Sequence, residues 1–197
     1  MEGAGGGDGV LYLIGLGLGG ENDITGAGLA AVQSCDEVFL EAYTSVLPGV
    51  SSEDLARRYG KSVTVADRRL VEQGEEAILG PVARGKRVAF LVVGDPFGAT
   101  THSDLHWRAA ERGLRVRVVH NASILNAAGC CGLQLYRFGQ TVSVTFPEGS
   151  VLPRSTYDKI AVNCAARLHT LCLLDIKYGC SLVGVRPGLT FFSFFAG

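Results

Sequence analysis

Short apolar runs alternate with capped, helix-forming segments along nearly the whole chain. The runs are rich in β-branched and aromatic residues, and they predict strands at residues 10–16, 37–42, 63–66, 87–93, 116–120, 142–146 and 170–176. The segments between them predict helices at residues 26–34, 52–59, 69–79, 103–112, 123–132 and 156–168. Because strands and helices that alternate in this way pack as layers, the pattern predicts an α/β fold with a mainly parallel sheet.

Polar residues and glycines mark the ends of several predicted helices. Thr25 is a candidate N-cap for the helix at 26–34, and Ser51 or Ser52 is a candidate for the helix at 52–59. Gly113 is expected to end the helix at 103–112. The N-cap of that helix is expected to be one of the hydroxyl residues Thr100, Thr101 and Ser103.

The segments that follow four of the strands are rich in glycine, acidic and hydroxyl residues. They cover residues 15–20, 41–44, 94–101 and 120–123. Ligands of parallel α/β sheets bind beyond the carboxyl ends of the strands, where such segments meet. The sequence therefore predicts a site for a small molecule at this edge of the sheet.

The strand at 87–93 stops abruptly at Gly94-Asp95-Pro96. Pro96 fixes its own φ and makes the turn stiff. Asp95 could accept hydrogen bonds from a ribose or an ammonium group, or it could cap its own loop as an Asx turn. Gly98 leaves room for a ligand to approach. His102 could be an acid or base, although a lone histidine at a helix start is more often structural.

The first glycine loop allows a different interpretation. Its glycines match the G-x-G-x-x-G dinucleotide motif, and Glu41 follows about 20 residues later, which would make the chain an NAD-dependent oxidoreductase. Against this, the acidic residues Glu21 and Asp23 would repel a pyrophosphate, and the helix cap is Thr25 rather than a residue of the motif. A tight turn that binds no ligand remains a third alternative. The glycines of the motif are Gly15, Gly17 and Gly20.

Charge, hydropathy and cysteines limit the class of protein. A net charge of −1 argues against a nucleic-acid partner, and no apolar run approaches the roughly 18 residues of a membrane span. Cys35, Cys164 and Cys172 lie in apolar segments and are expected to be buried free thiols, which predicts a cytoplasmic protein. The spacing of the cysteines predicts no metal site. Residues 1–9 are expected to be a flexible glycine-rich extension.

Long blocks of the chain resemble one enzyme family. They include "LYLIGLGLGGENDIT", "AFLVVGDPFGATTHSDL", "VHNASILNAAGCCGLQLYRFG" and "HTLCLLDIK". These blocks resemble the diphthine synthases, which are tetrapyrrole-methylase-like methyltransferases that use S-adenosylmethionine. The resemblance covers about residues 10 to 177. It implies two α/β domains, at residues 10–120 and 121–177, with the cofactor in the cleft between them.

The resemblance also implies a reaction. The substrate would be the aminocarboxypropyl-modified histidine of translation elongation factor 2, trimethylated at its amine and esterified at its carboxylate, with S-adenosylhomocysteine as product. A homodimer is implied as well. No dedicated catalytic side chain is expected, because alignment of the reactants can carry much of such a displacement. The implied cofactor contacts are Leu18, Asp95, Gly98, Ser123, Ile124 and Leu174.

Residues 178–197 depart from the family pattern and form an apolar tail. The second domain is therefore expected to be incomplete. One alternative is that the chain is a catalytically impaired, truncated isoform that binds or dimerises. Another is that the tail contains a strand that completes the second sheet.

Overall fold

The computed structural model describes residues 9–45, 47, 49–146, 153–175 and 192–195. Contacts along the backbone divide the chain into two compact units, Met1–Ser123 and Ile124–Gly197. Each unit has its own sheet, one with five strands and one with three.

The first unit is built on a parallel sheet with the strand order β3-β2-β4-β1-β5. In the centre of the sheet, Ile14 of β1 lies opposite Leu91 of β4 and Val119 of β5. The prediction of a mainly parallel α/β sheet is thus confirmed. The strands are β1 Val10–Gly15, β2 Glu37–Glu41, β3 Thr64–Ala66, β4 Arg87–Val92 and β5 Arg115–Val119.

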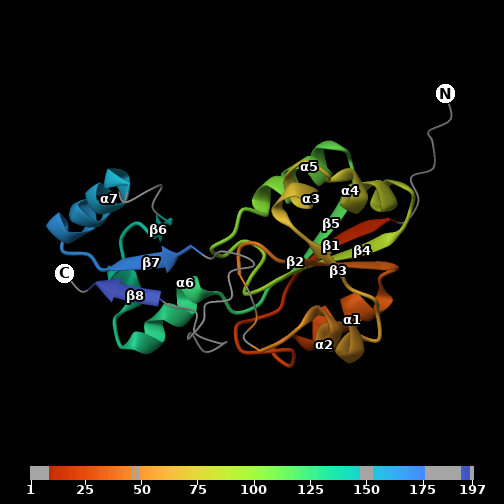
Figure 1. Cartoon of the computed structure of the whole chain (residues 1–197), viewed down its shortest axis with the longest axis horizontal. Coiled ribbons are helices and arrows are strands. Elements are labelled where there is room, and N and C mark those ends of the chain that lie inside the picture. Colours follow the sequence, from red (N-terminus) through yellow and green to blue (C-terminus); the bar gives the residue numbers. More distant parts are fainter. Residues whose placement is uncertain (1–8, 46, 48, 147–152, 176–191, 196–197) are drawn as a thin grey trace. The chain divides into compact units, whose positions relative to one another are not determined.

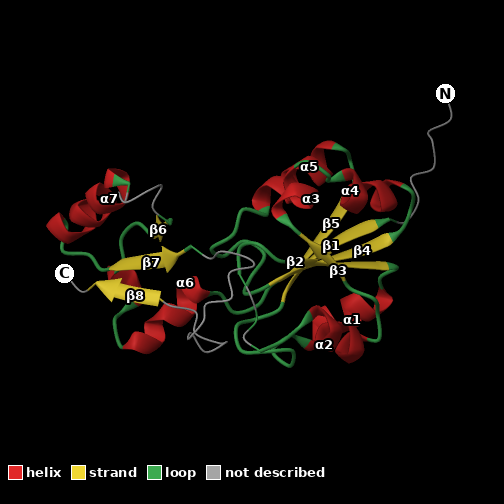
Figure 2. Cartoon of the chain, viewed as in Figure 1, coloured by secondary structure: helices red, strands yellow, loops and turns green. Residues whose placement is uncertain are grey.

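Helices cover both faces of this sheet (Figures 1 and 2). On one face, Ile14 and Leu91 belong to an apolar cluster with α1 and α2; on the other, Leu13 and Phe90 belong to a cluster with α3, α4 and α5. Neighbouring residues of a strand point to opposite faces, so a strand that is covered twice must be apolar throughout. The helices are α1 Gly26–Ser34, α2 Ser52–Tyr59, α3 Arg68–Glu72, α4 Glu76–Ala83 and α5 Ser103–Glu111.

The single helix predicted at residues 69–79 is wrong, because the structure has two helices there, α3 and α4. The break falls at Gly74, whose N–H donates to the carbonyl oxygens of Arg69 and Leu70 and so closes α3. Glycine is about 1 kcal/mol less favourable than alanine inside a helix, which makes it a natural position for the interruption.

The N-cap predicted for α5 is also wrong. His102 occupies the N-cap position, and its side chain makes no capping hydrogen bond. The hydroxyl of Thr100 donates instead to the carbonyl oxygen of Pro96, at 2.7 Å, and so closes the loop that precedes the helix. The Thr100 hydroxyl therefore stabilises the turn at Pro96 and does not cap the helix.

At α2, the structure decides between the two candidate caps. Ser51 accepts from the N–H of Asp54 at 3.1 Å, and the Asp54 carboxylate accepts in turn from the N–H of Ser51 at 3.0 Å, which is a capping box. We expect Ser51→Ala to lower the free energy of unfolding by about 1 kcal/mol. Ser52→Ala is the control, and urea denaturation measures both. An equal loss from the two substitutions would contradict the assignment.

The second unit has a three-stranded sheet in the order β6-β7-β8, with β6 and β7 parallel and β7 and β8 antiparallel. The tail contains the strand β8 Phe192–Phe195, which pairs with β7, as one of the two alternatives predicted. Residues 178–191 lie outside the described residues, and the alternative of a truncated isoform stays a prediction. The other elements of this unit are α6 Ile124–Ala127, β6 Val142–Val144, α7 Arg154–Ala165, β7 Thr170–Leu174 and the 3-10 turns Ala128–Cys131 and Leu135–Arg137.

Two further predictions can be compared with the structure, one on a helix of the second unit and one on the cysteines. The helix predicted at residues 123–132 is only one α-turn followed by a 3-10 turn, and it ends at Gly132 with φ of 88°. Cys35 and Cys172 are buried as expected, but Cys164 is exposed, so that part of the cysteine prediction is wrong. In the described part of the chain, no helix is long and apolar enough to cross a membrane.

Candidate functional site

The carboxyl ends of β1 and β4 form the centre of the candidate site. These strands are neighbours, but the chain leaves β1 toward β2 on one side and leaves β4 toward β5 on the other. Such a reversal of direction is the usual ligand-binding position of an open α/β sheet. The two loops are joined there, because Gly17 and Gly94 exchange backbone hydrogen bonds of 3.2 and 2.8 Å. Both glycines have positive φ, 76° and 79°, which other residues rarely adopt.

Asp95 follows Gly94 and organises the loop edge. One carboxylate oxygen accepts from the N–H of Phe97 at 2.9 Å, which is the Asx turn considered above. The other accepts from the N–H of Asn121 at 3.1 Å and contacts the ring of His120 at 2.8 Å. Burial alone would raise the pKa of Asp95, but these hydrogen bonds outweigh it and lower the pKa. An ionised carboxylate is therefore fixed at the site at neutral pH.

His120 is held at the end of β5 by this carboxylate. Its Nδ1 lies 2.8 Å from Oδ2 of Asp95, while 68% of its side chain is exposed. An ionised carboxylate only accepts hydrogen bonds, so Nδ1 of the ring must donate. The neutral imidazole then carries its free acceptor on Nε2.

Asn121 ties the end of β5 to the first glycine loop. Its amide group donates to the carbonyl oxygens of Gly15 and Asp23, both at 3.0 Å. Its Oδ1 accepts from the N–H of Ala122 at 2.8 Å. Asn121 was not among the residues predicted from the sequence to form the site. The available signal was its position directly after a strand, where a polar side chain can reach the neighbouring loop.

The structure brings four of the predicted cofactor contacts together. A Cβ on Gly98 would lie 2.2 Å from Oγ of Ser123 and 3.5 Å from Cβ of Asp95, so only a glycine allows this packing. A Cβ on Gly94 would lie 3.7 Å from the side chain of Leu18. Leu18, Asp95, Gly98 and Ser123 therefore converge at one edge of the sheet.

The remaining two predicted contacts belong to the second unit. Ile124 begins α6 and follows Ser123 directly in the chain. Leu174 ends β7 and is 37% exposed. Their contacts with a cofactor stay predictions.

The geometry of Glu41 argues against the dinucleotide interpretation. Its side chain is buried, and its carboxylate accepts from the N–H groups of Tyr43 and Thr44 and from the Thr44 hydroxyl. Burial raises the pKa of Glu41 although these hydrogen bonds oppose the shift. The carboxylate is thus occupied by its own loop and is not presented to a ribose. In addition, α1 begins after Thr25, which accepts from the N–H of Gly28, so no helix starts within the glycine motif.

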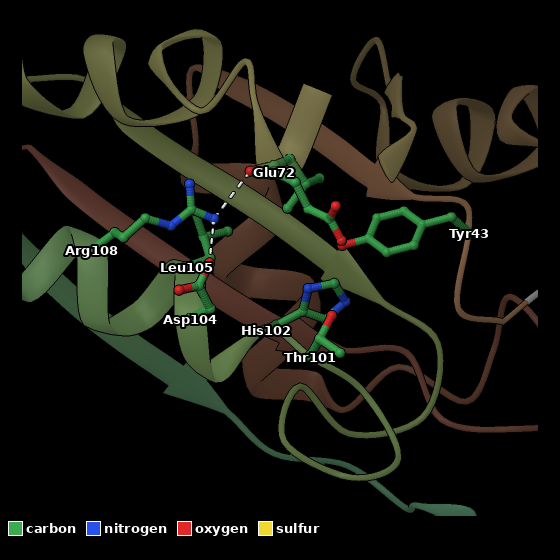
Figure 3. Close-up of a pocket in the computed structure, with 8 residues that line it drawn as sticks. Tyr43, Glu72, Thr101, His102, Asp104, Leu105 and Arg108 are labelled. Carbon is green, nitrogen blue, oxygen red and sulfur yellow. Dashed lines mark hydrogen bonds and ion pairs between the residues drawn. The ribbon is translucent and has the colours of Figure 1, made fainter. Parts of the chain in front are cut away.

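A separate hollow of about 240 Å³ lies beside the start of α5 (Figure 3). Tyr43 and His102 point into it from one side, and Arg108 borders it on the other, where it donates to the Val71 carbonyl oxygen and pairs with Asp104. The ring of His102 packs edge-on against Tyr43 and Phe90, with centroid distances of 5.9 and 5.1 Å. Neither ring nitrogen has a hydrogen-bond partner among the described residues.

Burial lowers the pKa of His102 from 6.5 to about 4. The unfolded chain therefore binds a proton at this histidine before the folded chain does, and stability falls as the pH is lowered from 6.5 to 4. We expect this residue to account for a loss of about 3 kcal/mol across that window. His102→Phe should flatten the profile, measured by urea denaturation at each pH. An unchanged profile in the variant would contradict the assignment.

Comparison with known proteins gives a consistent set of relatives. A sequence profile of the tetrapyrrole (corrin/porphyrin) methylases matches residues 10–186. The diphthine methyl ester synthase of Homo sapiens is 58% identical over 168 residues, which cover 85% of this chain and 58% of that protein. Diphthine methyl ester synthase 2 of Candida albicans is 56% identical over 168 residues, which cover 85% of this chain and 56% of that protein.

Solved structures agree with the sequence comparison. A putative diphthine synthase from Entamoeba histolytica superposes with a TM-score of 0.76 at 53% identity, covering 86% of this chain and 64% of that one. A second diphthine synthase gives a TM-score of 0.79 at 36% identity, covering 85% of this chain and 64% of that one. The chain spans between 56% and 59% of the length of the curated relatives that it matches.

Proposed function

The chain belongs to the tetrapyrrole (corrin/porphyrin) methylase family, and from this membership we propose that it is an S-adenosylmethionine-dependent methyltransferase of the diphthine methyl ester synthase type. Its substrate is the aminocarboxypropyl-modified histidine of elongation factor 2. In this proposal the enzyme acts in the cytoplasm. The relatives at 55% to 58% identity that carry this enzyme's name support the proposal.

The observation that carries the proposal is the convergence of Leu18, Asp95, Gly98 and Ser123 at the β1/β4 edge. S-adenosylmethionine bears a positive sulfonium and a positive ammonium group, and the ionised Asp95 supplies a negative charge near them. Within the glycine loop, Gly20 leaves its backbone open, since no described atom lies within 4 Å of the position of a Cβ there, whereas Gly17 and Gly19 pack closely against Asp23. These residues of the first unit support a cofactor site at this edge, and we propose Ile124 and Leu174 as further cofactor contacts.

When bound, the cofactor supplies a methyl group on a sulfonium that is ready for displacement. The chain's own residues bind and orient the two reactants, and in-line alignment of nucleophile and methyl group contributes much of the rate. The amine of the substrate receives three methyl groups and its carboxylate receives one as an ester. We also propose that the chain forms a homodimer, as the resemblance to the diphthine synthases implies.

Calorimetric titration of the chain with S-adenosylhomocysteine tests the proposal, with NAD as the control ligand. We expect a micromolar dissociation constant for the first ligand, which corresponds to about −8 kcal/mol, and no heat from NAD. Methyl transfer is then measured by mass spectrometry on elongation factor 2 that carries the aminocarboxypropyl group. A chain that binds NAD and not S-adenosylhomocysteine would refute the proposal.

A further inference from the structure

We propose that His120 is the general base that removes the proton from the substrate amine before each N-methylation, with Asp95 as the residue that positions its ring. This inference rests on the proposed function and goes beyond it, because alignment of the reactants alone leaves the amine protonated. No catalytic side chain was expected from the sequence, whereas the geometry of this pair points to one.

The hydrogen bonds of Asp95 determine the tautomer of the His120 ring. Oδ2 of Asp95 lies 2.8 Å from Nδ1 of His120 and also accepts from the N–H of Asn121 at 3.1 Å. The N–H of Phe97 occupies the other oxygen. The carboxylate is thus held in place from both sides, and its charge favours the proton on Nδ1. This arrangement leaves Nε2 as an acceptor, as in the carboxylate–histidine pairs of acid–base enzymes.

The ring of His120 is accessible to a substrate. The side chain of His120 is 68% exposed, so Nε2 can meet a substrate that arrives from solvent. The ring also lies beside the residues expected to hold the cofactor. It contacts Asp95, and Cβ of Asp95 lies 3.5 Å from the position of a Cβ on Gly98. A proton acceptor and the methyl donor would therefore share one edge of the sheet.

Other titratable groups near this edge are less suited to the role. Both oxygens of Glu41 are occupied by the loop that follows β2. The carboxylate of Asp23 accepts from the N–H of Gly19 at 2.6 Å. His102 is buried with both ring nitrogens away from solvent. The rings of His106 and His120 both lie near Phe97, with centroid distances of 5.7 and 6.2 Å, but among the described residues only the His120 ring pairs with a carboxylate.

Methylation of the substrate amine needs a base. An amine with a pKa of roughly 8 to 10 is mostly protonated at neutral pH and has no free electron pair. Nε2 of His120 takes one proton, and the freed pair on nitrogen forms a bond to the methyl carbon. The carbon–sulfur bond breaks, and its electrons stay on sulfur, which becomes the neutral thioether of S-adenosylhomocysteine. The imidazolium then returns its proton to solvent.

The base is used in three steps and not in the fourth. Each of the three N-methylations must remove one proton from nitrogen, because the product of the preceding step is again an ammonium. Esterification differs, since the carboxylate is already ionised at neutral pH and attacks the methyl group without losing a proton. Loss of the base should therefore slow N-methylation and spare esterification, a split that a general structural defect would not produce.

Two measurements on the full chain decide the proposal. Long-range proton–nitrogen NMR reports the tautomer of the neutral His120 ring, and we expect the proton on Nδ1. A dominant Nε2–H tautomer overturns the proposal, whatever the activity of the chain. This readout does not depend on bound cofactor.

The second measurement is step-resolved methyl transfer by His120→Asn, whose amide can still donate to Asp95. We expect N-methylation to fall by about 100-fold to 10,000-fold. Esterification of a substrate that is already trimethylated, and affinity for S-adenosylhomocysteine, should be unchanged. His106→Asn is the control and should leave every step unchanged. Added imidazole should partly restore N-methylation by His120→Gly.

The outcomes separate the two proposals. An active wild-type chain whose N-methylation survives His120→Asn, or loses both kinds of step equally, overturns the general base and leaves the proposed function standing. A wild-type chain that neither binds S-adenosylhomocysteine nor transfers methyl groups overturns the proposed function, and the general base falls with it.

Discussion

Replacing Asp95 with alanine is expected to weaken binding of S-adenosylhomocysteine by a factor of about 100 or more and to lower the free energy of unfolding by about 2 kcal/mol. The carboxylate serves three donors, which are the N–H groups of Phe97 and Asn121 and the ring of His120. Alanine leaves all three without this acceptor. The partly buried N–H groups of Phe97 and Asn121 each cost roughly 1 kcal/mol or more when they lose their partner, whereas the exposed His120 ring can bond to water instead. Calorimetry measures the affinity, and urea denaturation measures the stability.

Asp36→Ala is the matched control for this substitution. Its carboxylate also accepts from a backbone N–H, that of Arg87 at 2.8 Å, but at the amino ends of β2 and β4. We expect it to cost about 1 kcal/mol of stability and to leave the affinity unchanged. If both substitutions weakened binding equally, the effect would come from general destabilisation, and the site would not be at the β1/β4 edge.

The part of the fold that depends on local patterns could be predicted from the sequence. The runs at residues 10–16 and 87–93 became β1 and β4 with one residue fewer at the end, because strands covered on both faces must be apolar throughout. The cap at Thr25 was equally clear, since a hydroxyl residue preceding a helix satisfies its first N–H groups. These signals lie within a few residues of the structure they specify.

The interactions between distant loops could not be predicted in this way. Asn121 joins the carbonyl oxygen of Gly15 across 106 positions of the chain, and no local pattern records such a contact. The position of Glu41 in the sequence was misleading for a related reason. Its spacing from the glycine loop matched a dinucleotide motif, but only the structure shows that its carboxylate is used by Tyr43 and Thr44.

The same limit explains why the general base was missed. His120 begins the strand-end segment 120–123, but no residue near it in the sequence indicates its partner. Its pairing with Asp95 depends on β5 and β4 flanking β1 in the sheet, which brings residues 25 positions apart to within 2.8 Å. Charged side chains at strand ends thus acquire their roles from strand order, and the order β3-β2-β4-β1-β5 follows from packing rather than from any one motif.

Phe90→Ala is expected to have the largest effect on stability, about 3 to 5 kcal/mol. Phe90 is fully buried in β4, in the apolar cluster covered by α3, α4 and α5, and its ring packs against His102 with a centroid distance of 5.1 Å. Truncation removes this contact area and leaves a cavity that close-packed neighbours fill only in part. Urea denaturation of the variant gives the loss directly.

Two further variants show whether the loss comes from the cavity. Phe90→Leu retains much of the side-chain volume and should cost less than the alanine substitution. Trp107→Ala removes a larger aromatic group from α5, but 57% of Trp107 is exposed, so a change within about 0.5 kcal/mol is expected. Domains of this kind are stable by only about 5 to 15 kcal/mol, so the alanine variant should unfold at markedly lower urea concentration. A loss from Phe90→Ala no larger than that from Trp107→Ala would mean that this face of the sheet is not packed as described.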